Sequence, residues 1–229
     1  MPAEVRRFAD ADELGRALAR EIVELRPQLL GCPGGRSLVS SYRALAESEE
    51  DLSGMTIVMM DEYVPVPRQN AHYSCRGFGL REIAGPLGIP DERVWLPNPD
   101  DPGEYEKRIE AAGGIDMFLL ASGASDCHVA FLPPGSPVDG TTSVVELAES
   151  TRRDNLATFP EFASLDDVPT QGVSVGLDTI TRARRLRLVL HGPDKRTAAE
   201  RILARDRFDP SWPATVVHEH PDAQVLVAP

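Results

Sequence analysis

Short apolar runs that alternate with helix-like segments restrict the fold of this chain more than any other feature. Several of the runs, such as 55–60, are continuously apolar, which is typical of strands buried on both faces. The runs fall at 28–32, 55–60, 116–121, 172–177, 185–190 and 223–228, and helix-like segments fall at 14–25, 38–47, 75–84, 102–112 and 194–204. This order predicts an α/β fold, a single domain over residues 1–229. Its mainly parallel, twisted, Rossmann-like sheet would have helices on both faces.

The length and the cysteines narrow the class of protein further. A chain of 229 residues can bury a substantial core. The three cysteines, Cys32, Cys75 and Cys127, are odd in number, far apart and without a CxxC pair. This pattern argues against a disulfide framework or a structural zinc site, so we expect no metal and no cofactor. The N-terminus has no signal-like apolar region, and no run approaches the ~18 apolar residues of a membrane span, so we expect a cytoplasmic protein with no membrane partner.

The charge of the chain excludes another class of partner. The sequence has 36 acidic and 24 basic residues, a formal net charge of −12. Binding to a phosphate backbone requires clustered positive charge, so no nucleic-acid partner is predicted. The arginine-rich segment 181–187 is interpreted as the solvated end of a helix.

A glycine-rich turn follows the first buried run. Gly34, Gly35, Arg36 and Ser37 lie between a strand and a helix, where backbone N–H groups and a guanidinium can hold an anion. Lys195 begins a later helix and could neutralise the same anion. Ligands of parallel sheets bind at the carboxyl ends of the strands, and both segments lie there. The alternatives are a turn that is merely tight and a lysine that is merely solvated.

Two carboxylates, Asp61 and Glu62, directly follow the apolar run 55–60. A partly dry cleft at a strand end can shift carboxyl pKa values, which makes Asp61 the better candidate for a proton-transferring base. The alternative is structural: Asp61 would cap a turn and Glu62 would pair with an arginine.

The segment "ASDCHVAFLPPGSP" places an acid, a thiol and an imidazole after the run 116–121. His128 beside Asp126 has the parts of a general base and its orienting carboxylate, although a lone histidine is more often structural. A nucleophilic Cys127 paired with His128 is disfavoured, because neighbouring side chains on an extended segment point in opposite directions. The polar segment 150–169 is either a surface excursion or a lid over the site.

Taken in order, these motifs resemble the glucosamine-6-phosphate deaminase/isomerase and 6-phosphogluconolactonase superfamily. The matching stretches are "CPGGRSL", "MDEYV", "DCHVAFLPPGSP", "HGPDK" and "HEHPDAQVLV", and the resemblance covers about residues 7–227. In the deaminases it implies that Asp61 moves a proton between C1 and C2 of an opened sugar and that His128 takes part in ring opening. It also implies that Ser37 and Lys195 hold the sugar phosphate. In the lactonases it implies that His128 is the base for attack of water on a lactone.

Three positions depart from the deaminase pattern. Pro133 stands where a glutamate assists the histidine, Ala157 stands where an arginine binds phosphate, and Cys127 replaces a glycine. Glu161 is a candidate to supply the missing acid. We therefore expect a deaminase/isomerase-like enzyme with an altered active site, which acts on a small-molecule sugar phosphate. The alternatives are a 6-phosphogluconolactonase-type hydrolase and a non-catalytic sugar-phosphate-binding protein, and a homo-oligomer stays open.

Overall fold

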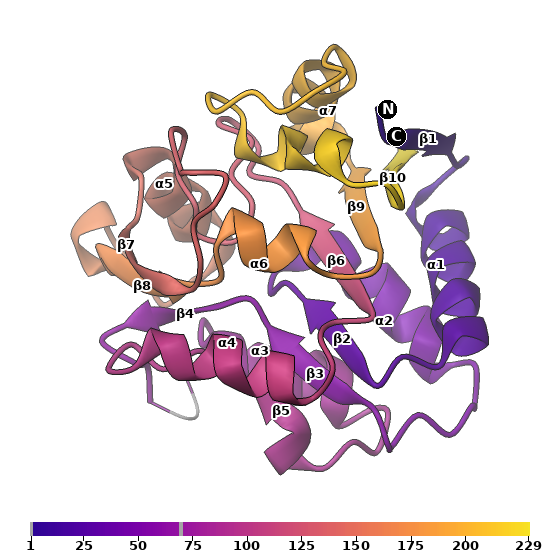
Figure 1. Ribbon diagram of the computed structural model, residues 1–229. Coiled ribbons are helices and arrows are strands. Elements are labelled where there is room, and N and C mark those ends of the chain that lie inside the picture. The colour runs from indigo at the N-terminus through magenta and orange to yellow at the C-terminus, as the bar shows by residue number, and fades with distance from the viewer. Residues whose placement is uncertain (1, 69–70) are drawn as a thin grey trace.

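The computed structural model describes residues 2–68 and 71–229, and its larger sheet is parallel throughout (Figure 1). Within these described residues, seven strands pair in the spatial order β1-β10-β9-β6-β2-β3-β5. They are β1 (Glu4–Arg7), β2 (Leu29–Cys32), β3 (Thr56–Met59), β5 (Val94–Trp95), β6 (Met117–Ala121), β9 (Leu186–His191) and β10 (Ala223–Ala228). The predicted parallel sheet is confirmed, and five of the six apolar runs belong to it.

The remaining run, 172–177, was expected in the parallel sheet but contributes a strand to a second, smaller sheet. Here β4 (Asp61–Val64), β8 (Gln171–Ser174) and β7 (Ser143–Glu146) pair antiparallel in that spatial order. Only Met60 separates β3 from β4, so no crossover helix can return β4 to the parallel sheet, and β8 pairs with it instead. Asp61 and Glu62 therefore come just after β3, as expected, and also begin β4.

Each expected helical segment contains a helix, whereas two further helices, α5 (Glu149–Thr158) and α6 (Leu177–Thr181), lie outside the expected segments. The others are α1 (Ala11–Leu25), α2 (Val39–Ala46), α3 (Cys75–Phe78), α4 (Pro102–Ala111) and α7 (Arg196–Leu203). The segment 75–84 is divided, because α3 continues as a π-helical stretch at Gly79–Ala84. Short 3₁₀ turns occupy Arg36–Leu38, Asp91–Arg93, Leu165–Asp167, Pro193–Lys195 and Pro213–Glu219.

Helices cover both faces of the parallel sheet, as predicted. Successive side chains of a strand point to opposite faces, and Leu119 and Leu120 of β6 accordingly belong to two separate buried clusters. Leu119 shares its cluster with Leu14 of α1, and Leu120 shares the other with Ile202 of α7. All of these side chains are fully buried, so each face of the sheet has a continuous apolar core.

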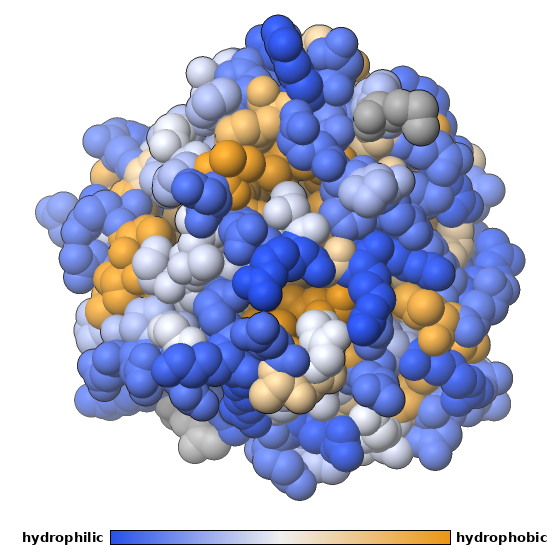
Figure 2. Space-filling model, viewed as in Figure 1, coloured by the Kyte–Doolittle hydropathy of each residue, from blue (hydrophilic) through white to orange (hydrophobic). Residues whose placement is uncertain are grey.

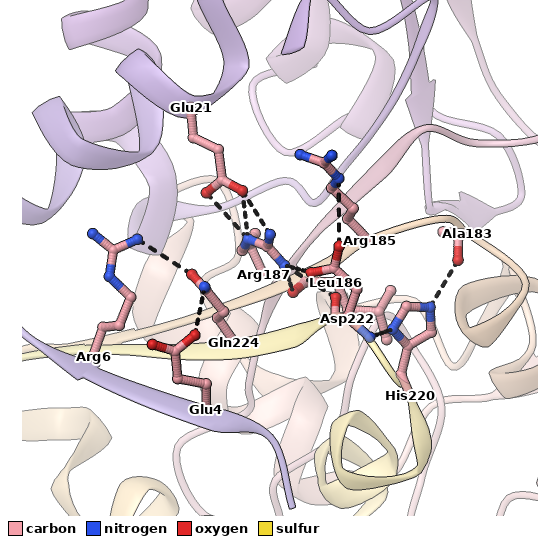
Figure 3. Close-up of polar contacts among 10 residues, drawn as sticks. All are labelled: Glu4, Arg6, Glu21, Ala183, Arg185, Leu186, Arg187, His220, Asp222 and Gln224. Carbon is pink, nitrogen blue, oxygen red and sulfur yellow. Dashed lines mark hydrogen bonds and ion pairs between the residues drawn. The ribbon is translucent and has the colours of Figure 1, made fainter. Parts of the chain in front are cut away.

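A buried ion pair attaches α1 to the sheet and corrects one part of the expectation for 181–187 (Figure 3). The segment does begin at the end of α6, where Arg182 and Arg184 are exposed, but Arg187 belongs to β9 and its side chain is only 4% exposed. Its guanidinium donates to both carboxylate oxygens of Glu21 on α1, at 2.6 to 3.1 Å, and to Asp222. A buried arginine is tolerated because each side of the guanidinium meets a carboxylate.

The surface agrees with the acidic composition. Figure 2 shows one face covered mainly by hydrophilic residues, with the hydrophobic ones in small separate areas. No helix in the described part of the chain has the length and apolar character needed to cross a membrane.

The strand order has a switch point between β2 and β6. From β2 the chain builds β3 and β5 on one side, and it later builds β6, β9 and β10 on the other. The connections that leave β2 and β6 therefore diverge, which opens a crevice at the carboxyl ends of these two strands.

Candidate active site

A cavity of about 300 Å³ occupies this crevice. Its walls come from the turn after β2, the start of β4, the loop after β6, the end of β9 and the helix α5. Of the nine predicted site residues, seven line it: Gly34, Gly35, Arg36, Ser37, Asp61, His128 and Lys195. Asp126 and Glu62 lie behind the wall and contact residues that form it.

The glycine-rich turn has a backbone that only glycine adopts easily. Gly35 has a φ of 89° and a ψ of −178°, and the 3₁₀ turn with Arg36 and Ser37 begins directly after it. His191 at the end of β9 fixes the turn from the other side, since its Nε2 lies 2.8 Å from the carbonyl oxygen of Ser37. The backbone N–H groups of Gly34 and Gly35 have no acceptor among the described residues, and with the Arg36 guanidinium they make this part of the lining suitable for an anion.

Lys195 lines the same cavity. Its Nζ donates to the carbonyl oxygen of Ser122 at 2.9 Å. Burial lowers the pKa of this amine, and Arg36 lowers it further, while Asp194 and Asp154 act in the opposite direction. Arg36 and Lys195 both line the cavity, and an anion bound there would favour the charged form of the amine.

Asp61 is the buried acid of the cavity. Burial raises its pKa to about 7, opposed by a hydrogen bond from Cys75, while Glu62 raises it and His128 lowers it. A carboxyl with a pKa near neutrality can both accept and return a proton at physiological pH.

Glu62 has a different environment from its neighbour. Its carboxylate accepts the backbone N–H groups of Tyr63, Cys75 and Arg76 at 3.0 Å each, and the Ser74 hydroxyl at 2.9 Å. These bonds satisfy the free N–H groups at the start of α3 and attach that helix to β4. The arginine partner that sequence reasoning considered for Glu62 is absent among its contacts in the described residues.

His128 is held by Asp126, whose Oδ1 lies 2.8 Å from Nδ1 and also accepts the backbone N–H of His128. Burial alone would raise the pKa of Asp126, but its hydrogen bonds with His128 and Ser150 hold it well below its usual range. The loop can pass this close only because residue 123 is glycine: a Cβ there would overlap the imidazole ring. Cys127 has a φ of 54°, in the region that glycine prefers, and His128 still reaches the cavity.

The helix α5 supplies a wall that sequence reasoning described only as a surface excursion or lid. Thr151 lies 3.1 Å from Nδ1 of His128, and Asp154, Asn155 and Thr158 line the cavity one and two turns later. The amide nitrogen of Asn155 is buried without a partner among the described residues, so it is available to a ligand. The helical spacing of these four residues was a signal in the sequence, hidden by the low apolar content of the segment.

The substituted positions do not restore the groups that the family pattern would have. Pro133 is outside the lining, and Ala157 and Glu161 are exposed and outside it as well. The acid that α5 does bring to the cavity is Asp154, whose Oδ2 accepts the backbone N–H of Ala124 at 3.3 Å. Sequence reasoning missed Asp154, and it also missed Cys75 beside Asp61.

The arrangement has the parts for proton transfer on a small anion. The lining combines two cations and the backbone of a glycine-rich turn with an acid of near-neutral pKa and an oriented imidazole. In the described residues, 2–68 and 71–229, no cluster of histidine, cysteine or acidic side chains could hold a metal ion. Fold and site together define an α/β protein with acid–base groups in a cavity that a glycine-rich turn and two cations also line.

Comparison with known proteins places this architecture in a family. A family model described as glucosamine-6-phosphate isomerases/6-phosphogluconolactonase matches residues 9–227. A glucosamine-6-phosphate deaminase of Shouchella clausii (strain KSM-K16) is 33% identical over 233 residues, which cover 97% of this chain and 92% of that protein. One of Bacillus cereus (strain G9842) is 32% identical over 220 residues, which cover 93% and 81%. The chain belongs to the glucosamine-6-phosphate isomerase/6-phosphogluconolactonase family.

Solved structures agree with this assignment. A monomeric glucosamine-6-phosphate deaminase superposes with a TM-score of 0.89 at 27% identity, over 98% of this chain and 97% of that one. A 6-phosphogluconolactonase of Thermotoga maritima superposes with a TM-score of 0.73 at 18% identity, over 99% of each chain, and this match shows a shared fold.

Proposed function

We propose that this protein is a deaminase/isomerase of an amino-sugar phosphate, which converts glucosamine 6-phosphate into fructose 6-phosphate and ammonia. The observation that carries the proposal is the shared cavity, in which Asp61, with a pKa of about 7, lies with His128, a glycine-rich turn and two cations. The relatives at 32–33% identity, which are named glucosamine-6-phosphate deaminases, support it.

The glycine-rich turn and the two cations would hold the phosphate. Arg36 and Lys195 supply positive charge, and the backbone of Gly34, Gly35 and Ser37 supplies N–H groups. The phosphate would then fix the sugar so that its reacting carbons point toward Asp61 and His128, which is the positional contribution to the rate.

Asp126 prepares His128 for ring opening. An ionised carboxylate only accepts hydrogen bonds, so Nδ1 carries the proton and Nε2 is the free lone pair. Nε2 would take the proton of the anomeric hydroxyl and return a proton to the ring oxygen as the C1–O bond of the ring breaks. With Pro133 in place of the second acid, this step depends on the Asp126–His128 pair alone.

Asp61 would then carry out the isomerisation. Its carboxylate removes the proton from C2 of the opened sugar while the aldehyde oxygen at C1 takes up a proton from water, which gives an enol-amine. The carboxyl then returns its proton to C1, and the amine nitrogen releases one proton to water as the imine forms at C2. Water adds to the imine and ammonia leaves, giving the ketone. The near-neutral pKa of Asp61 suits both halves of this transfer.

Hydrolysis of a phosphorylated sugar lactone is the second candidate. It is favoured by one observation, the combination of an oriented His128 with Pro133, because attack of water on a lactone needs one base and no ring-opening acid. The solved lactonases share the fold, at 15–18% identity.

The proposal also includes a cytoplasmic location and a small-molecule partner. It leaves a homo-oligomer to a measurement of mass in solution, since one structural neighbour is described as monomeric.

The deciding experiment combines binding with turnover. Glucosamine 6-phosphate, fructose 6-phosphate and 6-phosphogluconate are first compared by thermal shift, which detects binding without catalysis. Release of ammonia from glucosamine 6-phosphate, lost in Asp61→Asn but with the thermal shift retained, supports the deaminase. Lactone hydrolysis that survives Asp61→Asn but not His128→Ala supports the second candidate. Binding without either reaction would contradict both.

A further inference from the structure

The Cys75 thiol contacts the proposed catalytic carboxyl directly. Its Sγ donates to Oδ1 of Asp61 at 3.2 Å, and both side chains line the cavity. The other cysteines, Cys32 and Cys127, are buried outside the lining. Burial raises the pKa of Cys75 well above its usual range, and Asp61 and Glu62 raise it further, so the S–H group is present throughout the working pH range.

The position of Cys75 is fixed by the neighbour of Asp61 in the sequence. Glu62 accepts the backbone N–H groups of Cys75 and Arg76 and the hydroxyl of Ser74, the residue that caps α3. The first turn of α3 is therefore attached to β4, the strand that begins with Asp61. Two adjacent carboxylates thus have separate tasks, because Glu62 holds the helix that brings the thiol to Asp61.

The other groups around Asp61 do not duplicate this contact. Glu62 raises its pKa and His128 lowers it through charge, and the phenols of Tyr63 and Tyr105 are near enough to sense its charge. Within the described residues, Cys75 is the one side chain that donates a hydrogen bond to the Asp61 carboxyl.

We propose that Cys75 is a positioning residue for Asp61, whose S–H bond engages Oδ1 and leaves Oδ2 as the atom that moves the substrate proton. The bond stabilises the ionised carboxylate against the cost of burial, because a donor favours the charged form of an acceptor. The role in catalysis rests on the proposed function of Asp61, whereas the effect on ionisation of Asp61 does not.

The experiment follows the ionisation of Asp61 in the ligand-free protein. Aspartate ¹³C-carboxyl NMR titrations are recorded for the native protein, Cys75→Ala, Cys75→Ser and Cys32→Ala, with the Asp61 signal assigned from Asp61→Asn. Loss of the donor in Cys75→Ala raises the apparent pKa by about half a unit to one unit, and the stronger hydroxyl donor of Cys75→Ser lowers it. Cys32→Ala removes a buried thiol that does not contact Asp61, so it leaves the titration unchanged.

Activity gives the second readout. The acidic limb of kcat/KM against pH moves in the same direction as the titration in each variant, while KM at high pH changes little. An unchanged titration, or a shift of one sign in both Cys75 variants, would overturn the proposal. If the Asp61 pKa shifts in opposite directions in Cys75→Ala and Cys75→Ser but the protein turns over no phosphosugar, the effect of Cys75 on Asp61 is supported and the proposed function is rejected. If Cys75→Ala does not fold, Cys75→Ser alone must still lower the pKa.

Discussion

Nδ1 of His128 lies 2.8 Å from Oδ1 of Asp126, two residues earlier in the same loop. The side chains are 16% and 11% exposed, so the pair is largely shielded from water. Because the carboxylate can only accept, this contact fixes the tautomer of the imidazole and leaves Nε2 free to act as a base.

Exchange of Asp126 for asparagine tests this orientation. The amide of Asp126→Asn can donate to Nδ1, which favours the opposite tautomer and removes the lone pair from Nε2. We expect kcat/KM to fall by roughly 10²–10⁴ with little change in phosphosugar binding. Steady-state kinetics and ligand-induced thermal shift measure the two effects.

Ser150 provides the matched control, because its hydroxyl donates to the other oxygen, Oδ2, of Asp126. Ser150→Ala removes a hydrogen bond but not the acceptor at Oδ1, so we expect a loss below about tenfold. Native turnover in Asp126→Asn would assign the pair a structural role only.

The pKa of Asp61 predicts the pH dependence of activity. The base must be ionised to take the C2 proton, and burial raises its pKa to about 7. We therefore expect kcat/KM to rise with pH up to about 7 and to level off above it, on the side of the profile that Asp61 controls. An acidic limb centred near pH 4 would show that the rate-determining base is a carboxyl in contact with water.

The same shift predicts a stability effect. A carboxyl whose pKa is 3.8 in the unfolded chain and about 7 in the fold binds more protons in the folded state between these values, so its contribution to stability decreases as pH rises through that window. Asp61→Asn removes this contribution. We expect the variant to be more stable than the native protein. The difference in free energy of unfolding should be small at pH 4, should grow up to pH 7 and should reach about 2 to 4 kcal/mol at pH 8. Urea unfolding at several pH values measures it, and a constant difference would contradict the assignment.

Much of the fold could be predicted because its signals are local. The runs that form β2, β3 and β6 are continuously apolar, and Leu14, Leu18 and Ile22 repeat at helical spacing along α1. The antiparallel pairing of β8 with β4 could not be predicted, since it follows from the short β3–β4 connection and not from any pattern within 172–177. The burial of Arg187 could not be predicted for a similar reason, because its carboxylate partner on α1 is 166 positions away.

The site residues also fall into those that a local signal in the sequence predicts and those that it does not. Asp61, His128 and the glycine turn stand at strand ends, where the general rule for parallel sheets places ligands. Cys75 and Asp154 have no such local signal in the sequence, because each belongs to a helix that is positioned by contacts with other segments. Glu62 positions α3, and the Asp126–His128 pair contacts α5.

The ion pair of Arg187 with Glu21 predicts a large effect on stability far from the cavity (Figure 3). Arg187→Ala leaves the Glu21 carboxylate, 19% exposed, without its partner, and breaking a buried pair in this way costs about 3 kcal/mol or more. Arg182→Ala removes an arginine that is 55% exposed and pairs with Asp178 at 3.6 Å, so we expect a loss below about 1 kcal/mol. Urea unfolding compares the two, and equal losses would show that the buried pair contributes nothing beyond a surface one.

The balance of charge at the proposed phosphate site gives the last prediction. Lys195 and Asp154 line the same cavity and carry opposite charges, so their neutral variants should change the affinity for a phosphorylated sugar in opposite directions. Lys195→Met removes a charge-assisted donor, and we expect about 10- to 100-fold weaker binding. Asp154→Asn removes a repulsive carboxylate, and we expect about two- to tenfold tighter binding. Calorimetry with the phosphorylated sugar and its unphosphorylated analogue measures both.

The unphosphorylated analogue is the control. Its affinity should change little in either variant, because the two residues act on the charge of the phosphate. Weaker binding of both ligands by Asp154→Asn would instead mean that this carboxylate accepts a hydroxyl of the sugar, and equal weakening of both by Lys195→Met would assign the lysine to the structure of the loop through Ser122.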